Sequence, residues 1–203
     1  METRSVFENI SPVDHRYSIS EKDVYDKLAR CISEEAAVRS CAKAEAALVK
    51  AHFEVRGALT SEIEQAIDAA ANSVDPEEVY AEEEKTQHNI RALVNVMKRT
   101  VPSEIAPFVH LGATSVDILD TALALRMRDV MQNVTLPELK ALEKALCDIA
   151  LRDAETPQVG RTHGQHAAPI TFGWTIAEFV SRLGKSIIKI EELAKQLKGK
   201  LAG

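Results

Sequence analysis

The chain has 203 residues, enough for one domain or two small ones, and its net charge of -6 comes from acidic and basic residues mixed along the sequence. This mixture argues against a nucleic-acid partner and against a basic surface that would bind a membrane. Hydrophobic residues make up 45% of the chain but aromatic ones only 4%, and the frequent alanines suit close contact between helices.

Helical periodicity and capping residues divide the chain into six predicted helices. A capping box of Ser20 with Asp23 opens the first helix, which stops before Gly57, and Pro76 after Asp75 opens the third. Residues 1–19 are expected to be irregular, and no segment alternates with period two over enough residues to predict a strand. The predicted helices cover about residues 20–56, 61–74, 75–99, 115–133, 137–154 and 172–200.

These elements predict an all-α fold with two parts. A smaller helical N-terminal domain is expected over residues 1–111, and the first part of a long-helix bundle over residues 112–203. The last predicted helix still shows Ile187, Ile190 and Leu193 at helical spacing. Because two or three long amphipathic helices cannot bury their apolar stripes alone, we expect a piece of a longer chain, an obligate oligomer, or both.

Cysteine and histidine usage predicts a cytoplasmic protein without a metal site. Cys31, Cys41 and Cys147 form no CxxC pair, which is typical of reduced thiols. The histidines lack the spacing of metal ligands, and we expect neither a metal nor another cofactor. No apolar run is long enough for a membrane span, and the first residues do not resemble a signal peptide.

The segment PQVGRTHGQHAAPITFG at residues 157–173 is the most informative part of the chain for function. It places His163 and His166 among glycines and prolines, which predicts an irregular loop between two long helices. A loop on a rigid helical scaffold is a common position for catalytic groups. A histidine in such a loop is also often only a hydrogen-bonded surface residue, so the segment by itself leaves both interpretations open.

A second candidate site lies at the predicted start of the fourth helix. In GATSVD, Thr114 and Asp117 are expected to cap the helix reciprocally. A helix N-terminus beside the hydroxyls of Thr114 and Ser115 also suits a carboxylate or phosphate. A cap without a ligand is the simpler interpretation of the same residues.

Three further positions are weak signals when each is taken alone. His88 falls inside the third predicted helix, where a histidine is usually structural, and His110 fits a cap at the end of a loop. Arg16 and Tyr17 are an ordinary pair, although a guanidinium with a phenol hydroxyl can grip a phosphate.

Taken in order, these motifs resemble the N-terminal half of the adenylosuccinate lyase family, part of the fumarase/aspartase superfamily. The motifs are Arg16-Tyr17, EEEKTQHN, HLGATSVD and GRTHGQHAAPITFG, and the resemblance covers about residues 11–203. The most specific feature is GATSxD followed about 45 residues later by GRTHGQ.

The resemblance implies a β-elimination that splits the C–N bond of adenylosuccinate into AMP and fumarate, and also cleaves the related succinyl-carboxamide ribotide. It implies that His163 is the general acid, a role that suits imidazole near neutral pH, and that His88, a second catalytic histidine, lies near it and the phosphate. It further implies a nucleotide substrate, no cofactor, and a homotetramer whose active sites combine segments from three subunits. The substrate-binding residues that it implies are Arg16, Tyr17, Gln87, His88, Asn89, His110, Thr114, Ser115 and Gln165.

Two departures from the family pattern keep other interpretations open. The family usually has His-Asp where this chain has His88-Asn89, and the lost charge leaves the exact substrate open. A sister lyase or cycloisomerase acting on another carboxylate substrate is therefore an alternative, as is a helical oligomerisation domain without catalysis. The family's GSSxMPxKxN loop, whose serine is the base, has no counterpart in these 203 residues.

Because the acid and the anion-binding residues are present but the base is not, we expect the 203-residue chain alone to have no lyase activity. Purified chain mixed with adenylosuccinate should release no fumarate, measured by absorbance and by mass spectrometry. Fumarate release above that of a heat-denatured sample would contradict this expectation.

Overall fold

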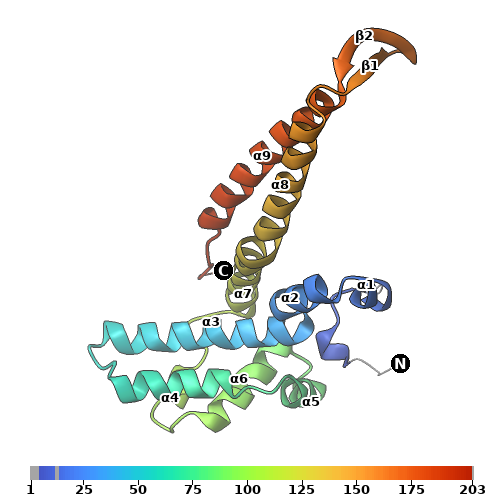
Figure 1. Ribbon diagram of the computed structural model, residues 1–203. Coiled ribbons are helices and arrows are strands. Elements are labelled where there is room, and N and C mark those ends of the chain that lie inside the picture. Colours follow the sequence, from blue (N-terminus) through green and yellow to red (C-terminus); the bar gives the residue numbers. More distant parts are fainter. Residues whose placement is uncertain (1–4, 12–13, 203) are drawn as a thin grey trace. The chain divides into compact units, whose positions relative to one another are not determined.

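The computed structural model describes residues 5–11 and 14–202, without the side chains of His15 and Tyr17 (Figure 1). Its regular structure is helical except for one two-stranded hairpin, which confirms the predicted all-α class. The chain divides into two compact units, Met1–Val130 with Leu197–Gly203, and Met131–Gln196. The domain boundary expected between residues 111 and 112 stays a prediction.

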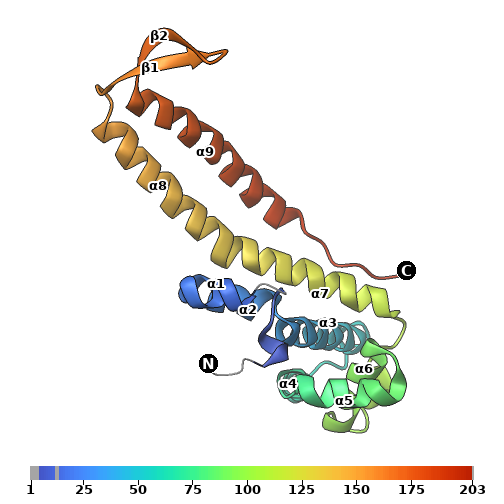
Figure 2. The same cartoon turned by 90° about the vertical axis from the view of Figure 1, so that its right-hand side faces the viewer.

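The first unit is built around one long alanine-rich helix, α3 (Glu34–Val55). This helix contacts α2, α4, α6 and α7, and Figures 1 and 2 show α7 on one side of it and α4 to α6 on the other. Its buried face includes Ala42, Ala46 and Val49. Small side chains let neighbouring helices approach closely, which explains a dense core with few aromatic residues. The other elements of this unit are η1 (Val6–Glu8), α1 (Asp14–Ser20), α2 (Lys22–Ile32), α4 (Ser61–Asn72), α5 (Pro76–Thr86), α6 (Asn89–Thr100), η2 (Ala106–Phe108) and α7 (Ser115–Val130).

Two predicted long helices are each interrupted by a polar cap. The helix predicted over 20–56 breaks at Ser33, whose hydroxyl accepts a hydrogen bond from the Ala36 N–H at 3.2 Å. The helix predicted over 75–99 breaks at Gln87, which has a positive φ of 52°. Apolar periodicity continues across both breaks, so the sequence pattern concealed them.

The first turns of the chain are more ordered than the sequence predicted. Residues 14–20 form α1 instead of an irregular segment, because the Asp14 carboxylate accepts hydrogen bonds from the backbone N–H groups of Ile10 and Ser11. The Tyr25 hydroxyl also donates to Asp14, at 2.5 Å. These contacts fix the N-terminal turn against α2.

The second unit is a pair of antiparallel helices closed by a β-hairpin (Figures 1 and 2). It contains η3 (Met131–Thr135), a π-helical turn, and α8 (Leu136–Arg152), β1 (Pro157–Thr162), β2 (Gln165–Thr171) and α9 (Phe172–Gln196). The prediction of an irregular loop over 157–171 was therefore wrong. His163 and Gly164 both have positive φ, as a two-residue type I′ hairpin turn requires. The strands were not predicted because most residues of the hairpin are exposed, so polar and apolar residues do not alternate along them.

The helices of this second unit leave many apolar side chains in solvent. At least half of the surface of each of these side chains is exposed: Leu142, Leu151, Trp174, Phe179 and Ile188. A pair of helices can bury only the strip along its mutual contact, which agrees with the expectation drawn from the apolar stripes. Within the described ranges 5–11 and 14–202, no helix is long and apolar enough to cross a membrane.

We predict that Gly173→Ala destabilises the second unit whereas Gly184→Ala does not. A Cβ at Gly173 would lie 2.3 Å from the Ala150 carbonyl oxygen. This oxygen belongs to the backbone near the end of α8 and cannot shift without distorting the helix. We expect a loss of about 1–3 kcal/mol in unfolding free energy, typical of overpacking.

Gly184→Ala is the matched control on the same helix. There the new Cβ meets only the flexible carboxylate end of Glu143, and replacing a helix-interior glycine gains about 0.5–1 kcal/mol. Denaturant unfolding of both variants checks the pair. Equal stability of the two variants would contradict the predicted close approach of α9 to α8.

Candidate active site

The start of α7 presents hydroxyl groups beside a helix N-terminus. Thr114 is exposed and Ser115, the first helical residue, is half-buried. The Asp117 side chain is 1% exposed, and it accepts hydrogen bonds from the Thr114 N–H and the Lys200 ammonium, each at 3.0 Å. The sequence predicted that Thr114 and Asp117 cap the helix reciprocally. The described residues show one of these two contacts, in which the Asp117 carboxylate accepts from the Thr114 N–H. The negative charge of Asp117 is therefore turned inward and paired.

His88 is the N-cap residue directly before α6. The prediction that it lies inside a helix was therefore wrong. Its Nδ1 accepts a hydrogen bond from the Arg91 N–H at 3.2 Å and so caps the helix. A ring nitrogen that accepts carries no proton, so the neutral ring bears its hydrogen on Nε2. The exposed His88 thus offers an N–H donor to solvent or to a ligand.

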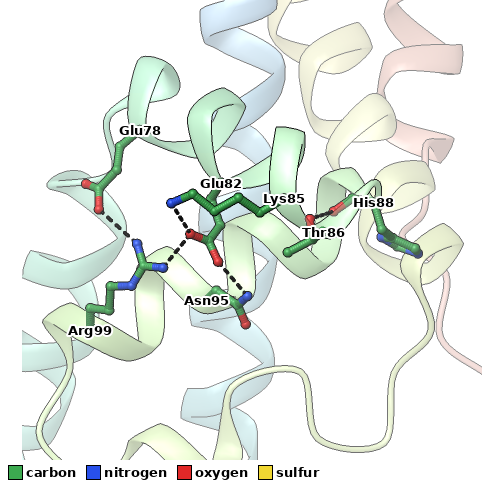
Figure 3. A network of polar contacts seen from close by, with 7 residues as sticks. All are labelled: Glu78, Glu82, Lys85, Thr86, His88, Asn95 and Arg99. Atoms are coloured by element: carbon green, nitrogen blue, oxygen red, sulfur yellow. Dashed lines mark hydrogen bonds and ion pairs between the residues drawn. The ribbon is translucent and has the colours of Figure 1, made fainter.

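A buried carboxylate fixes the two helices that flank this turn (Figure 3). Glu82 on α5 accepts hydrogen bonds from Arg99 at 2.5 Å and Asn95 at 2.9 Å, both on α6. These contacts, led by the one from Arg99, lower the pKa of the Glu82 carboxyl. Because the network ties α5 to α6, the turn at residues 87–89 is held from both sides.

The two residues beside His88 make local contacts of their own. The Gln87 amide donates to the Glu84 carbonyl at 2.9 Å, and the Asn89 side-chain oxygen accepts from the Ile90 N–H at 2.7 Å. Both residues are exposed. Asn89 therefore takes part in starting α6, a task that an aspartate at the same position also performs.

His110 precedes the start of α7 and contacts a residue that the sequence analysis missed. Its Nδ1 lies 2.6 Å from Oε1 of Glu45, a completely buried residue of α3. Burial raises the pKa of the Glu45 carboxyl, and His110 opposes that rise. The signal in the sequence was one acidic residue, Glu45, on the alanine-rich face of a predicted core helix, where an apolar residue is expected.

His163 lies at the tip of the hairpin in the second unit. It is exposed, and its Nδ1 lies 2.8 Å from the Thr162 hydroxyl, which leaves Nε2 for a ligand. Gln165 starts β2 and is also exposed. At Gly160 an added Cβ would lie 2.7 Å from the Ala168 carbonyl oxygen, so this glycine allows the two strands to pair closely.

The predicted site residues are divided between the two units. His163 and Gln165 belong to the second unit, and Arg16 is exposed on α1 in the first, while the side chain of Tyr17 lies outside the described part of the chain. The other members in the first unit are Gln87, His88, Asn89, His110, Thr114 and Ser115. No hydrogen bond among the described residues joins one of these side chains to another. The described part of the chain also contains no group of three or more His, Cys, Asp or Glu side chains that could hold a metal ion.

The chain belongs to the lyase family, whose sequence model matches residues 11–203. It is 33% identical over 188 residues to an adenylosuccinate lyase of Archaeoglobus fulgidus, which covers 93% of this chain and 40% of the relative. It is 40% identical over 104 residues to a 3-carboxy-cis,cis-muconate cycloisomerase of Pseudomonas putida, which covers 51% of this chain and 24% of that enzyme. The solved fumarate lyase of Mesorhizobium sp. BNC1 superposes with a TM-score of 0.76 at 30% identity, over 88% of this chain and 42% of that structure.

These similarities confirm the predicted membership of the fumarase/aspartase superfamily. The chain spans about two fifths of the length of the adenylosuccinate lyase and the fumarate lyase that it matches. The matches to a lyase and to a cycloisomerase agree with the two catalytic interpretations that the sequence left open.

The capping role of His88 predicts different effects for two substitutions. His88→Ala removes the acceptor for the Arg91 N–H and should lower the free energy of unfolding by about 1 kcal/mol. His88→Asn also removes the ring but keeps a capping acceptor, so it should lower the free energy of unfolding by only a few tenths of a kcal/mol. Denaturant unfolding at neutral pH measures both. An equal loss in the two variants would show that the ring stabilises the fold by packing and not by capping.

Proposed function

We propose that this chain supplies the proton-donating and anion-binding part of an enzyme that eliminates fumarate from adenylosuccinate. The same enzyme would cleave the related succinyl-carboxamide ribotide of purine synthesis. The observation that carries the proposal is the start of α7, where Thr114 and Ser115 present hydroxyl groups and the one carboxylate, Asp117, is turned inward. The similarity to an adenylosuccinate lyase over 93% of the chain supports this choice of substrate.

The helix start suits the charge that develops during elimination. When a base takes the proton next to a carboxylate, negative charge moves onto the carboxylate oxygens. Hydroxyl and backbone donors at a helix N-terminus stabilise that charge, and they are already in place before the reaction. Thr114 and Ser115 would bind the succinyl carboxylates in this way.

The departing nitrogen needs a proton, and His163 would supply it. With Nδ1 beside the Thr162 hydroxyl, Nε2 is the ring nitrogen available to the substrate. Imidazole suits this task because it exchanges a proton near neutral pH. In this proposal the base comes from another segment, and His88 with Arg16, Tyr17, Gln87 and Asn89 contacts the nucleotide.

A homotetramer with shared active sites accounts for two features of the second unit. His163 stands on an exposed hairpin tip, so a substrate that it protonates must be held by other parts of the assembly. The exposed apolar side chains of α8 and α9 would be buried against helices of other subunits. We therefore propose that the acid of one subunit serves a site completed by its neighbours.

A second candidate is a cycloisomerase or lyase for another carboxylate substrate. It is favoured by the 40% identity to the muconate cycloisomerase and by Asn89, which lacks the charge that adenylosuccinate lyases usually carry there. Both candidates use the carboxylate site at α7, so they differ only in the rest of the substrate.

The test measures kcat and KM of the complete enzyme for adenylosuccinate, argininosuccinate and carboxymuconate. We expect turnover of adenylosuccinate, and a fall of about 10²–10⁴-fold in kcat for His163→Ala with a much smaller change in KM, as for loss of a general acid. His166→Ala is the matched control, since His166 is also exposed on the hairpin and has no assigned role.

Three other outcomes would overturn parts of the proposal. Turnover of carboxymuconate alone would replace the substrate by that of the second candidate. If His163→Ala raises KM by as large a factor as it lowers kcat, His163 has a positioning role and is not the general acid. A variant without any effect would reject its own site, which is the proton donor for His163→Ala and the carboxylate site for Ser115→Ala.

A further inference from the structure

Glu45 is a buried acid with no evident role in stabilising the core. It lies on α3 between the buried residues Ala44 and Ala46, and its surface is 0% exposed. Its Oε1 contacts His110, while Oε2 has no hydrogen-bond partner among the described residues. Removing a carboxylate from water is costly, and an apolar residue of similar size would often stabilise the fold more. The acid therefore calls for an explanation other than packing.

The partner of Glu45 is held in an uncommon backbone conformation. His110 has a φ of 66°, in the left-handed region that residues other than glycine seldom occupy. Such strain persists only where the surroundings fix it, and it gathers at functional sites. The His110 side chain is still 19% exposed, so a ligand can reach it.

A second contact from α3 holds the next residue of the same loop. His52 Nε2 lies 2.8 Å from the Leu111 carbonyl oxygen, so His52 donates to that carbonyl. His52 follows Glu45 by seven residues, two helical turns, and so lies on the same face of α3. Phe53 of α3 also packs on Phe108, with 4.8 Å between the ring centroids. One face of α3 thus fixes the loop that leads into Gly112 and the start of α7.

We propose that Glu45 is a positioning residue that orients the His110 ring toward the substrate. With Nδ1–H donated to the buried carboxylate, Nε2 becomes the ring nitrogen that meets a ligand next to Thr114 and Ser115. A carboxylate behind a histidine selects the tautomer and the ring orientation in the same way at many metal and catalytic sites. This inference rests on the proposed function only in that the ligand is the lyase substrate.

The kinetic test is a double-mutant cycle in the complete enzyme with adenylosuccinate. Glu45→Gln should lower kcat/KM by about 10- to 100-fold, the range for loss of a carboxylate behind a ligating histidine. In a His110→Ala background Glu45→Gln should have no further effect, because Glu45 acts through the ring. Glu64→Gln, which removes an exposed partner of Lys50, is the control and should leave kcat/KM unchanged.

Glu45→Met keeps the test decisive if Glu45→Gln folds poorly. Methionine fills a similar volume without a buried polar group, so this variant should fold and show the same loss of kcat/KM. A purely structural role predicts the reverse, which is a lower melting temperature with normal kinetics. An equal loss from Glu45→Gln with and without His110 would overturn the proposal.

A spectroscopic readout separates this inference from the proposed function. In the ¹⁵N-histidine-labelled complete enzyme, the neutral His110 ring should carry its proton on Nδ1, and Glu45→Met should remove that preference. A wild-type ring protonated on Nε2 would overturn the inference whatever the enzyme turns over. If the ring shows the expected tautomer but the enzyme is inactive on every substrate tested, the proposed function is refuted. The contact by which Glu45 orients His110 is still supported in that case.

Discussion

The contact between Glu45 and His110 ties the core of the first unit to its candidate active site. α3 supplies an apolar alanine face to the core and, from the same helix, one buried carboxylate to the loop before α7. The position of His110, the left-handed turn that contains it and the start of α7 therefore depend on α3. Displacing α3 within the unit would move the site with it, because the contacts are short and the region is closely packed.

Polar side chains at helix ends connect folding with chemistry elsewhere in this unit. His88 satisfies a backbone N–H at the start of α6 and keeps Nε2 for other partners. Asp117 satisfies a backbone N–H beside the start of α7 and thereby turns its own charge away from that surface. In both cases the unsatisfied groups at a helix end provide the reason for a polar residue, and at His88 the other ring nitrogen is available to a ligand.

The two units differ in how completely they bury their apolar surface. The first unit has a continuous core that includes residues of α3, α4, α6 and α7. The helix pair of the second unit leaves side chains such as Trp174 and Phe179 more than half exposed. An unburied apolar surface of this kind favours assembly, since association removes it from water. The hairpin with His163 belongs to this same unit. If the exposed apolar surface is buried against other subunits, His163 would therefore serve a site that those subunits complete.

The sequence by itself determined the all-α class, most helix starts and the lyase family. Apolar spacing and caps such as Asp75-Pro76 are local signals, and the motifs around Ser115 and His163 are short and specific. It did not reveal the breaks at Ser33 and Gln87, because apolar periodicity crosses them, nor the hairpin, because an exposed strand pair shows no alternation of polarity.

Only the tertiary structure decided which distant residues meet. Glu45 and His110 are 65 positions apart, and no local pattern pairs a lone acid on a core helix with a histidine in a later loop. The tautomer of His88 depends on a local contact with the Arg91 N–H, but it was also not predicted, because the apolar pattern runs across the point where α6 begins. Chemistry that depends on such contacts arises from packing, whereas the residue types that perform it are already present in the sequence.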